Sequence, residues 1–403
     1  MSLLEDYIKD INKLETAREK GKYKRIRSID FVMGLAICLI ILAHTSDAWL
    51  DSDWRYAVGL VYSILDVFGS SLFIFLSALS VVFSMSTKAG MIPEKVIRNN
   101  IFTRGISIIA LGVVYNLISV KNVPFPLNLW GWNIIMFIGF AQIITYYALK
   151  LSRGSRIAAG VSIIFLTSQI REFLYVGKDT NPVIWILHFI IVSPAPHNPF
   201  VPYVSLCFFS TIFGEMFFEA MLLETEEAYK DVFHRFIRYG FFSIILGFFL
   251  MLLSGNILVT PNEYDINEYP FIQLVPIMQD QNYVELPGMP LILLKGTAAN
   301  SFYSLGVALM ILGVSFYYID IKRKDNRFID MLIFYGRVSL SLFFISYIWL
   351  FLFYRQVNII FFFFLWGGYL GLLGILMYIW NKEWGGKYSL EWLMCQMGRE
   401  KNK

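Results

Sequence analysis

The first long apolar stretch of the chain, residues 31–50, reads FVMGLAICLIILAHTSDAWL. About 20 residues of helix, rising 1.5 Å each, are enough to cross the hydrocarbon core of a bilayer. Similar runs recur up to residue 380, and 57% of the 403 residues are apolar while only 16% are charged. The sequence therefore predicts an all-α polytopic membrane protein. It excludes a soluble enzyme, a secreted disulfide scaffold and a disordered chain.

The hydropathy pattern predicts about ten transmembrane helices. The second stretch is too long for one straight crossing, and Gly69, Ser70 and Ser71 mark the place where we expect it to break. A further apolar stretch at 182–193 is too short to span, so we interpret it as re-entrant or interfacial. The predicted spans are 31–50, 57–85, 101–119, 131–149, 157–174, 200–223, 237–258, 299–319, 333–354 and 357–380.

The basic residues orient these spans. With the N-terminus in the cytoplasm, the inner segments hold 27 of the 34 Lys and Arg residues and the outer loops hold six. This split agrees with the positive-inside rule, so the sequence predicts that both termini are cytoplasmic. The expected localisation is the cell membrane, which the protein crosses many times.

The sequence divides into three parts. Residues 1–24 read as a cytoplasmic amphipathic segment, 25–381 as the transmembrane domain with an outer loop at 255–295, and 382–403 as a cytoplasmic tail. No cleavable signal peptide is expected, because the first 30 residues lack an apolar core. A net charge of +4 does not favour nucleic acid, and the three widely spaced cysteines indicate neither a metal site nor a disulfide framework.

An acid and a histidine share one face of the first span. Asp30 and His44 are 14 residues apart, which places them within about 40° of each other and roughly 21 Å apart along a helix. Asp47 follows His44 at i+3, where a carboxylate can orient an imidazole that acts as a general base. The alternative is a histidine that only hydrogen-bonds a neighbouring helix.

Other polar residues also lie within or beside predicted spans, where ionisable groups are costly. Glu215 and Glu219 form one acidic face; they are either a proton or ion site, or, as we favour, partners of Arg235 or Arg238. The serines of the second span fit plain helix packing. The remaining candidates are Asp66 in the second span, the inner basic residues Arg27, Arg98 and Arg104, the intramembrane Arg337, Asn116 in the third span, and His188 and His197 in the outer connector.

Several motifs, taken in order, resemble the heparan-alpha-glucosaminide N-acetyltransferase-like family of the transmembrane acyltransferase superfamily. The resemblance covers most of residues 25–395. It rests on Arg27-Ser-Ile-Asp30 with Gly34, His44 and Asp47; on residues 71–80; on Arg104-Gly105, Leu111-Gly112 and Asn116; on Phe137-Ile-Gly139; on residues 199–203 with Gly214; on Gly336-Arg-Val-Ser-Leu340; and on Leu390-Glu-Trp392.

The chain departs from the family pattern at three positions. Met33 stands where an arginine is frequent before the first-span glycine, and Tyr203 where tryptophan is frequent. Ser346, beside Tyr347, stands where a histidine usually follows the Gly-Arg-x-Ser-Leu segment. These departures keep open a member of the family that retained the fold without the activity.

The resemblance implies acyl transfer across the membrane. Acyl-CoA, in particular acetyl-CoA, is the implied co-substrate, and no metal is implied. Arg27, Asp30, Arg98, Arg104, Asn116 and Arg337 would form the donor site, and His44 with Asp47 would be catalytic. The acceptor would be a glycan or glycolipid outside the cell, with His44 acting as general base or carrying the acyl group itself.

Two other classes remain open. One is a transporter or flippase for a lipid or acyl-bearing solute, with His44, Asp66 and Glu215 as a proton relay. The other is a non-catalytic membrane subunit of the same fold. The expected partners are membrane lipids, the acyl-CoA donor and the outer acceptor, with a homodimer as one option for the assembly.

Overall fold

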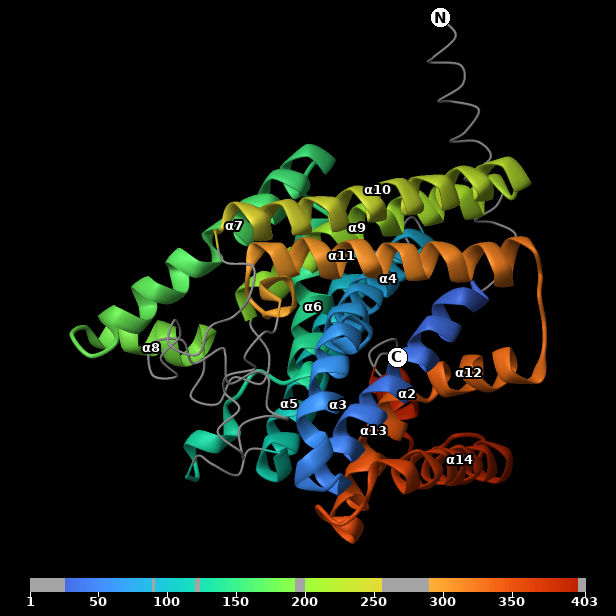
Figure 1. Cartoon of the computed structure of the whole chain (residues 1–403). Helices are drawn as coiled ribbons and strands as arrows, with labels where there is room; N and C mark the ends of the chain where they lie inside the picture. The colour runs from blue at the N-terminus through green and yellow to red at the C-terminus, as the bar shows by residue number, and fades with distance from the viewer. Residues whose placement is uncertain (1–25, 89–90, 120–123, 193–199, 256–289, 398–403) are drawn as a thin grey trace, which may run out of the picture.

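The protein is built from helices in the computed structural model, which describes residues 26–88, 91–119, 124–192, 200–255 and 290–397 (Figure 1). Within these ranges the only extended pairing is an isolated bridge between Leu50 and Val357. The helices are α2 (Arg27–Trp49), α3 (Ser52–Leu65), α4 (Ser70–Lys88), α5 (Glu94–Ser119), α6 (Ile134–Ala148), α7 (Arg153–Gly177), α8 (Pro182–Ile191), α9 (Phe200–Leu223), α10 (Glu226–Leu253), α11 (Ala298–Phe316), α12 (Arg327–Arg337), α13 (Ser339–Ile348), α14 (Ile359–Trp384) and α15 (Leu390–Met397).

Eight helices of the described chain are long and apolar enough to cross a membrane. The bent pair α12 and α13 would make nine if it counts as one span. The prediction of ten included residues 131–149, but α6 has only 15 residues, fewer than a crossing needs. An all-α polytopic membrane protein is thus confirmed, whereas the count by length and composition is lower than predicted.

Two predicted spans are interrupted. The 57–85 stretch divides at the 3₁₀ turn Asp66–Phe68, next to the expected break at Gly69, and α4 then begins at Ser70. The 333–354 stretch was predicted as one span, but α12 and α13 meet at an angle of 82°. Val338 lies between them with φ −115° and ψ 23°, outside the helical region. Hydropathy does not detect this bend, because the stretch 333–354 as a whole is apolar although Arg337 and Ser339 flank Val338.

The helix α10 begins well before the predicted span 237–258. The helix α10 begins at Glu226, and the side chain of its N-cap residue Thr225 accepts a hydrogen bond from the backbone N–H of Ala228 at 3.2 Å. Lys230 and Arg235 pair with acids one turn earlier. Charged residues form this first part of α10, so an apolar window alone started the helix too late.

The helices pack as interlocking layers around one apolar core. Figure 1 shows α9, α10 and α11 side by side, with α4 and α6 packed beneath them. The next layer is α2, which contacts α4, α11, α12, α13 and α14. The helix that carries Asp30 and His44 is therefore central.

A close approach of two helices fixes α12 against α2. A Cβ on Gly34 would overlap the backbone carbonyl of Leu332, and a Cβ on Gly336 would overlap that of Asp30. Only glycine fits at such a contact between two helix backbones. Because Gly336 immediately precedes Arg337, this crossing brings the arginine to the N-terminal end of α2, the predicted inner end.

Three sequence predictions fall on residues that the structure does not describe. These are the amphipathic segment 1–24, the interior of the outer loop 255–295, and the last residues of the tail 382–403. They stay predictions.

Candidate functional site

An ion pair lies near the predicted inner end of α2. The Nε atom of Arg337 donates a hydrogen bond to Oδ2 of Asp30 at 3.3 Å. The carboxylate is buried, whereas 49% of the Arg337 side chain is exposed. Two residues that sequence reasoning assigned to donor binding are thus in contact, although they are separated by 307 positions. The exposed part of the guanidinium is accessible from outside the helix pair.

Arg27 is held by acidic residues. Its guanidinium donates to Asp325 at 3.0 Å and to Asp330 at 2.8 Å, and the hydrogen bond from Arg27 lowers the pKa of the Asp325 carboxyl in the loop. The backbone N–H groups of Arg27 and Ser28 donate to the two carboxylate oxygens of Asp320. A carboxylate at a helix N-terminus accepts orphan N–H groups and complements the helix dipole. Asp320 was not a sequence candidate.

His44 lies at the other end of α2, against α13. The hydroxyl of Tyr347 is 3.0 Å from Nδ1 and 2.9 Å from Nε2 of His44. A neutral imidazole offers one donor and one acceptor nitrogen, so this hydroxyl can bind either tautomer. Phe343 from α13 packs edge-on against the imidazole with ring centroids 6.0 Å apart. Tyr115 of α5 completes this aromatic cluster: its ring centroid lies 4.9 Å from that of Tyr347.

Asp47 is one turn beyond His44, and α2 continues to Trp49, so both residues belong to one continuous helix. Both side chains are only partly buried. The sequence condition for an imidazole with a carboxylate at i+3 is therefore met. A direct role of Asp47 in orienting His44 stays a prediction.

Tyr347 is the residue of this site that sequence reasoning did not select. The chain has 23 tyrosines, and nothing in the local pattern distinguishes this one. Its only signal is its place beside Ser346, where the chain departs from the family pattern. Ser346 is buried; its hydroxyl donates to the carbonyl of Phe343 at 2.7 Å, and its own carbonyl accepts from Tyr369 at 2.6 Å. The side chain next to the departure is the one that contacts His44.

Asn116 fixes the start of α6. Its amide nitrogen donates to the carbonyls of Leu129 and Gly131 at 3.1 and 2.8 Å. Its oxygen accepts from the amide of Asn133 at 2.7 Å, and Asn133 is in turn the N-cap of α6. The side chain is fully buried. These contacts account for Asn116 as a structural residue, and donor binding by it stays a prediction.

Arg98 and Arg104 are exposed on α5. The C-terminal helix α15 packs against α5 and also against α13, near the bend that follows Arg337. The structure thus connects the helix that carries both arginines with the α12–α13 bend, while neither arginine is among the contacts of His44 described above. Their role toward phosphates stays a prediction.

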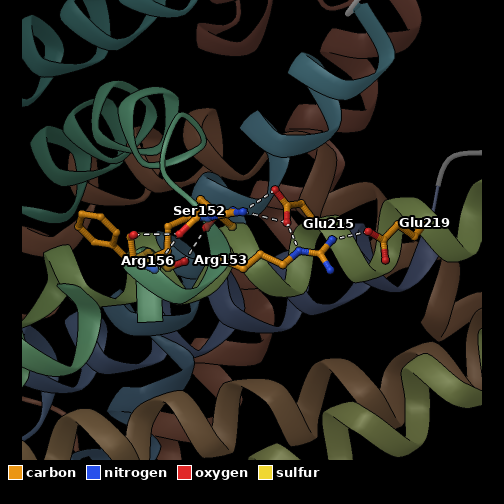
Figure 2. Close-up of polar contacts among 8 residues, drawn as sticks. Ser152, Arg153, Arg156, Glu215 and Glu219 are labelled. Atoms are coloured by element: carbon orange, nitrogen blue, oxygen red, sulfur yellow. Dashed lines mark hydrogen bonds and ion pairs between the residues drawn. The ribbon is translucent and has the colours of Figure 1, made fainter. Parts of the chain in front are cut away.

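The acidic pair of α9 has different partners from those we favoured. Figure 2 shows Glu215 between Arg153 and Arg156 of α7, and Glu219 beside Arg153. Arg153 Nε and Arg156 Nη2 each lie 2.8 Å from a Glu215 carboxylate oxygen, and Arg153 also pairs with Glu219. Arg235, one of the expected partners, binds Asp231 instead. This cluster joins α7 to α9.

The other sequence candidates lie apart from these contacts. His188 is on the short apolar helix α8, where burial is the largest cause that lowers its pKa to about 4. Asp66 begins a 3₁₀ turn, and His197 lies outside the described residues. Among the described side chains, no group of three or more His, Cys, Asp or Glu is arranged to hold a metal ion.

Together, the fold and these contacts define a multi-pass helical membrane protein with polar residues at both ends of one central helix. The sequence model of one family, described as "Heparan-alpha-glucosaminide N-acetyltransferase, catalytic", matches residues 25–239. This is more than half of the chain, and the chain belongs to that family. No curated protein matches the sequence.

The matched region contains part of the candidate site. It runs from the residues before α2 into α10 and includes His44, Asp47, Arg98, Arg104 and Asn116. Arg337, Tyr347 and the C-terminal helix lie beyond it. The family thus supports a membrane acetyltransferase, and the side chains that complete both ends of α2 come from the unmatched part of the chain.

Proposed function

We propose that the protein transfers an acyl group, in the simplest case acetyl, from cytoplasmic acyl-CoA to a glycan or glycolipid at the outer face of the cell membrane. The contact between His44 and Tyr347 carries this proposal. It puts an imidazole, a hydroxyl and the carboxylate of Asp47 at one end of α2. The arginine-bearing end lies about 21 Å away along the same helix.

The inner end supplies the charges that a nucleotide needs. Arg337 exposes about half of its side chain beside Asp30, and Arg98 and Arg104 are exposed on α5. Guanidinium groups bind phosphate oxygens through paired hydrogen bonds. Arg27 contributes less to this proposal, because Asp325 and Asp330 already occupy its guanidinium.

The chemistry needs one proton acceptor at the outer end. His44 takes the proton from the acceptor's hydroxyl or amine, whose oxygen or nitrogen then attacks the thioester carbonyl carbon. The carbon–sulfur bond breaks, the acyl group stays on the acceptor, and the CoA thiolate leaves and recovers a proton. Tyr347 holds the imidazole ring when its hydroxyl accepts from the protonated ring nitrogen, so that the other nitrogen can take the proton. A general base of this kind typically contributes about 10²–10⁴-fold in rate.

The test is transfer of a labelled acetyl group by the purified full-length protein in lipid nanodiscs. We expect label to move from acetyl-CoA to a glycan or glycolipid acceptor, and His44→Ala to abolish the transfer. Acetyl-CoA that remains intact with every acceptor class, while the same protein in sealed proteoliposomes moves a labelled solute across the membrane, would favour a transporter instead. Wild-type rates in His44→Ala would contradict the role of the histidine.

A further inference from the structure

The C-terminal helix α15 meets the first turn of α13 through three hydrogen bonds. The backbone N–H of Ser341 donates to Oε1 of Glu391 at 2.9 Å, and the hydroxyl of Ser341 donates to the other carboxylate oxygen. The backbone N–H of Leu390 donates back to the Ser341 hydroxyl at 3.0 Å. Leu390 and Glu391 belong to the last motif of the sequence, and Ser341 directly follows the motif that ends at Leu340.

This contact supplies a cap that α13 does not have locally. The residue before the helix, Val338, has no side-chain hydrogen bond to the first turn. A helix start leaves four backbone N–H groups without an intrahelical partner. An N-cap side chain normally accepts from the second or third of them, and here the carboxylate of Glu391 accepts from the third residue, Ser341. Its negative charge also suits the positive end of the helix dipole.

The cap lies at the start of a short helix that directly follows a sharp bend. The chain bends by 82° between α12 and α13, and α13 has only 10 residues. Tyr347 follows Ser341 by six positions, about 9 Å along the helix. A shift at the start of α13 therefore moves the Tyr347 hydroxyl away from its contact with His44.

The helix α15 also contacts α5. α15 contacts α5 as well as α13, and α5 supplies Tyr115, whose ring packs against Tyr347 and Phe343. α15 thus contacts both α13, which carries Tyr347, and α5, which carries Tyr115.

We propose that Glu391 is a positioning residue for the proposed transfer reaction: its carboxylate caps α13 and so holds Tyr347 against His44. The inference rests on the proposed function. It assigns to the C-terminal segment, which lies beyond the matched family region, a part in the reaction of the central helix. Glu391 touches no reacting atom; it acts through Ser341 and the backbone of α13.

The experiment compares Glu391→Ala and Glu391→Gln with the wild-type full chain in nanodiscs. Glu383→Ala is the matched control, because Glu383 is an exposed glutamate on the preceding helix α14. Two quantities are measured on each protein. The first is acetyl transfer as a function of acetyl-CoA concentration, and the second is hydrogen exchange of the α12 and α13 peptides.

We expect Glu391→Ala to lower kcat about tenfold or more, since small misplacements of a catalytic group are costly. KM for acetyl-CoA should not change, because the arginines of the inner end are untouched. Peptides from α13 should exchange faster while those from α12 do not. Glu391→Gln keeps one acceptor oxygen, so its kcat and its exchange in α13 should lie between those of the wild type and those of Glu391→Ala. Glu383→Ala should match the wild type.

Wild-type kcat in Glu391→Ala, a change in KM alone, or unchanged exchange in α13 would each overturn the inference while the proposed function stands. A wild-type protein without transfer would overturn the proposed function, and this inference with it. If Glu391→Ala does not fold, Ser341→Ala and Glu391→Gln carry the same measurements with the same outcomes.

Discussion

At the scale of the single residue, the candidate base His44 is contacted by the hydroxyl of Tyr347. Tyr347→Phe removes only the hydroxyl and keeps the ring that packs against Tyr115 and Phe343. We expect it to lower kcat for acetyl transfer by about tenfold, and His44→Ala to lower it by about 10²–10⁴-fold. The melting temperature should change little in either variant.

Tyr369→Phe is the control for this prediction. It removes another tyrosine hydroxyl of the same region, which donates to the carbonyl of Ser346 rather than to His44. Transfer rates per folded molecule should stay near the wild-type value. Equal losses of activity in Tyr347→Phe and Tyr369→Phe would show that the hydroxyl acts on the packing of α13 and not on the imidazole.

Loss of Glu215 and loss of Glu219 would leave different arginines without their carboxylate partner. Glu215 pairs with Arg156, of whose side chain only 4% is exposed, whereas Glu219 is 54% exposed and contacts only the partly exposed Arg153. Removing one partner of a buried ion pair costs about 3–5 kcal/mol, while exposed pairs contribute about 0–1 kcal/mol. Glu215→Ala should therefore lower the melting temperature clearly, and Glu219→Ala should not. Equal melting temperatures would contradict this reading of the cluster.

At the scale of the element, the close approach of α2 and α12 can be tested with one added methyl group. Gly336→Ala places a Cβ onto the backbone carbonyl of Asp30, so the two helices must separate. Overpacking of this kind costs about 1–3 kcal/mol. The separation also weakens the pair between Arg337 and Asp30. We expect a lower melting temperature together with weaker stabilisation by acetyl-CoA.

Gly367→Ala on α14 is the matched control, since its Cβ would meet no atom within 4 Å. Alanine is favoured over glycine inside a helix by about 1 kcal/mol, so the control should keep or raise the melting temperature. If Gly336→Ala behaves like Gly367→Ala, the close approach is not what positions Arg337.

Sequence reasoning located the helices but not their directions. A run of apolar residues shows that a segment avoids water, but it does not show in which direction the helix runs. The 82° angle at Val338 has no proline to mark it, and α10 begins among charged residues that an apolar window does not include. The missing information is tertiary, because these elements are fixed by contacts with other helices.

The sequence likewise predicted single residues of the site but not the contacts between them. His44 and Asp30 stand out because ionisable residues are rare in apolar spans. Their partners Tyr347 and Arg337 lie about 300 positions away in sequence. Arg337 stood out as a candidate site residue because it is a charged residue within an apolar span. Tyr347 did not, because it resembles the many other aromatic residues of the chain. Glu391 lay in a quoted motif, but only the folded chain shows that it contacts Ser341.

At the scale of the whole molecule, the distribution of basic residues predicts the orientation. Gly154 and Asp179 lie near opposite ends of α7 and are exposed. A cysteine at Asp179 should react with a membrane-impermeant thiol reagent on intact cells, and one at Gly154 only after permeabilisation. Cys38 and Cys207 are buried, and Cys395 would be replaced by serine. The opposite labelling pattern would reverse the proposed sides of donor and acceptor.

Binding of the donor should be visible without any acceptor. A ligand that binds only the folded state stabilises it by RT ln(1 + [L]/Kd), about 2.7 kcal/mol at 100 times Kd. We therefore expect acetyl-CoA to raise the melting temperature of the wild type in a concentration-dependent way. Arg337→Gln and the pair Arg98→Gln with Arg104→Gln should reduce the shift, because each removes an exposed guanidinium that we propose to bind the donor's phosphates.

Arg235→Gln is the control for charge alone. Arg235 is a partly exposed arginine on a predicted inner segment, and it pairs with Asp231 within its own helix. Its loss removes one positive charge without touching the contacts of α2, so the shift with acetyl-CoA should stay. His44→Ala should also keep the shift, because the histidine lies at the opposite end of α2 from these arginines. Equal loss of the shift in Arg235→Gln and Arg337→Gln would mean that overall positive charge, and not the inner end of α2, attracts the donor.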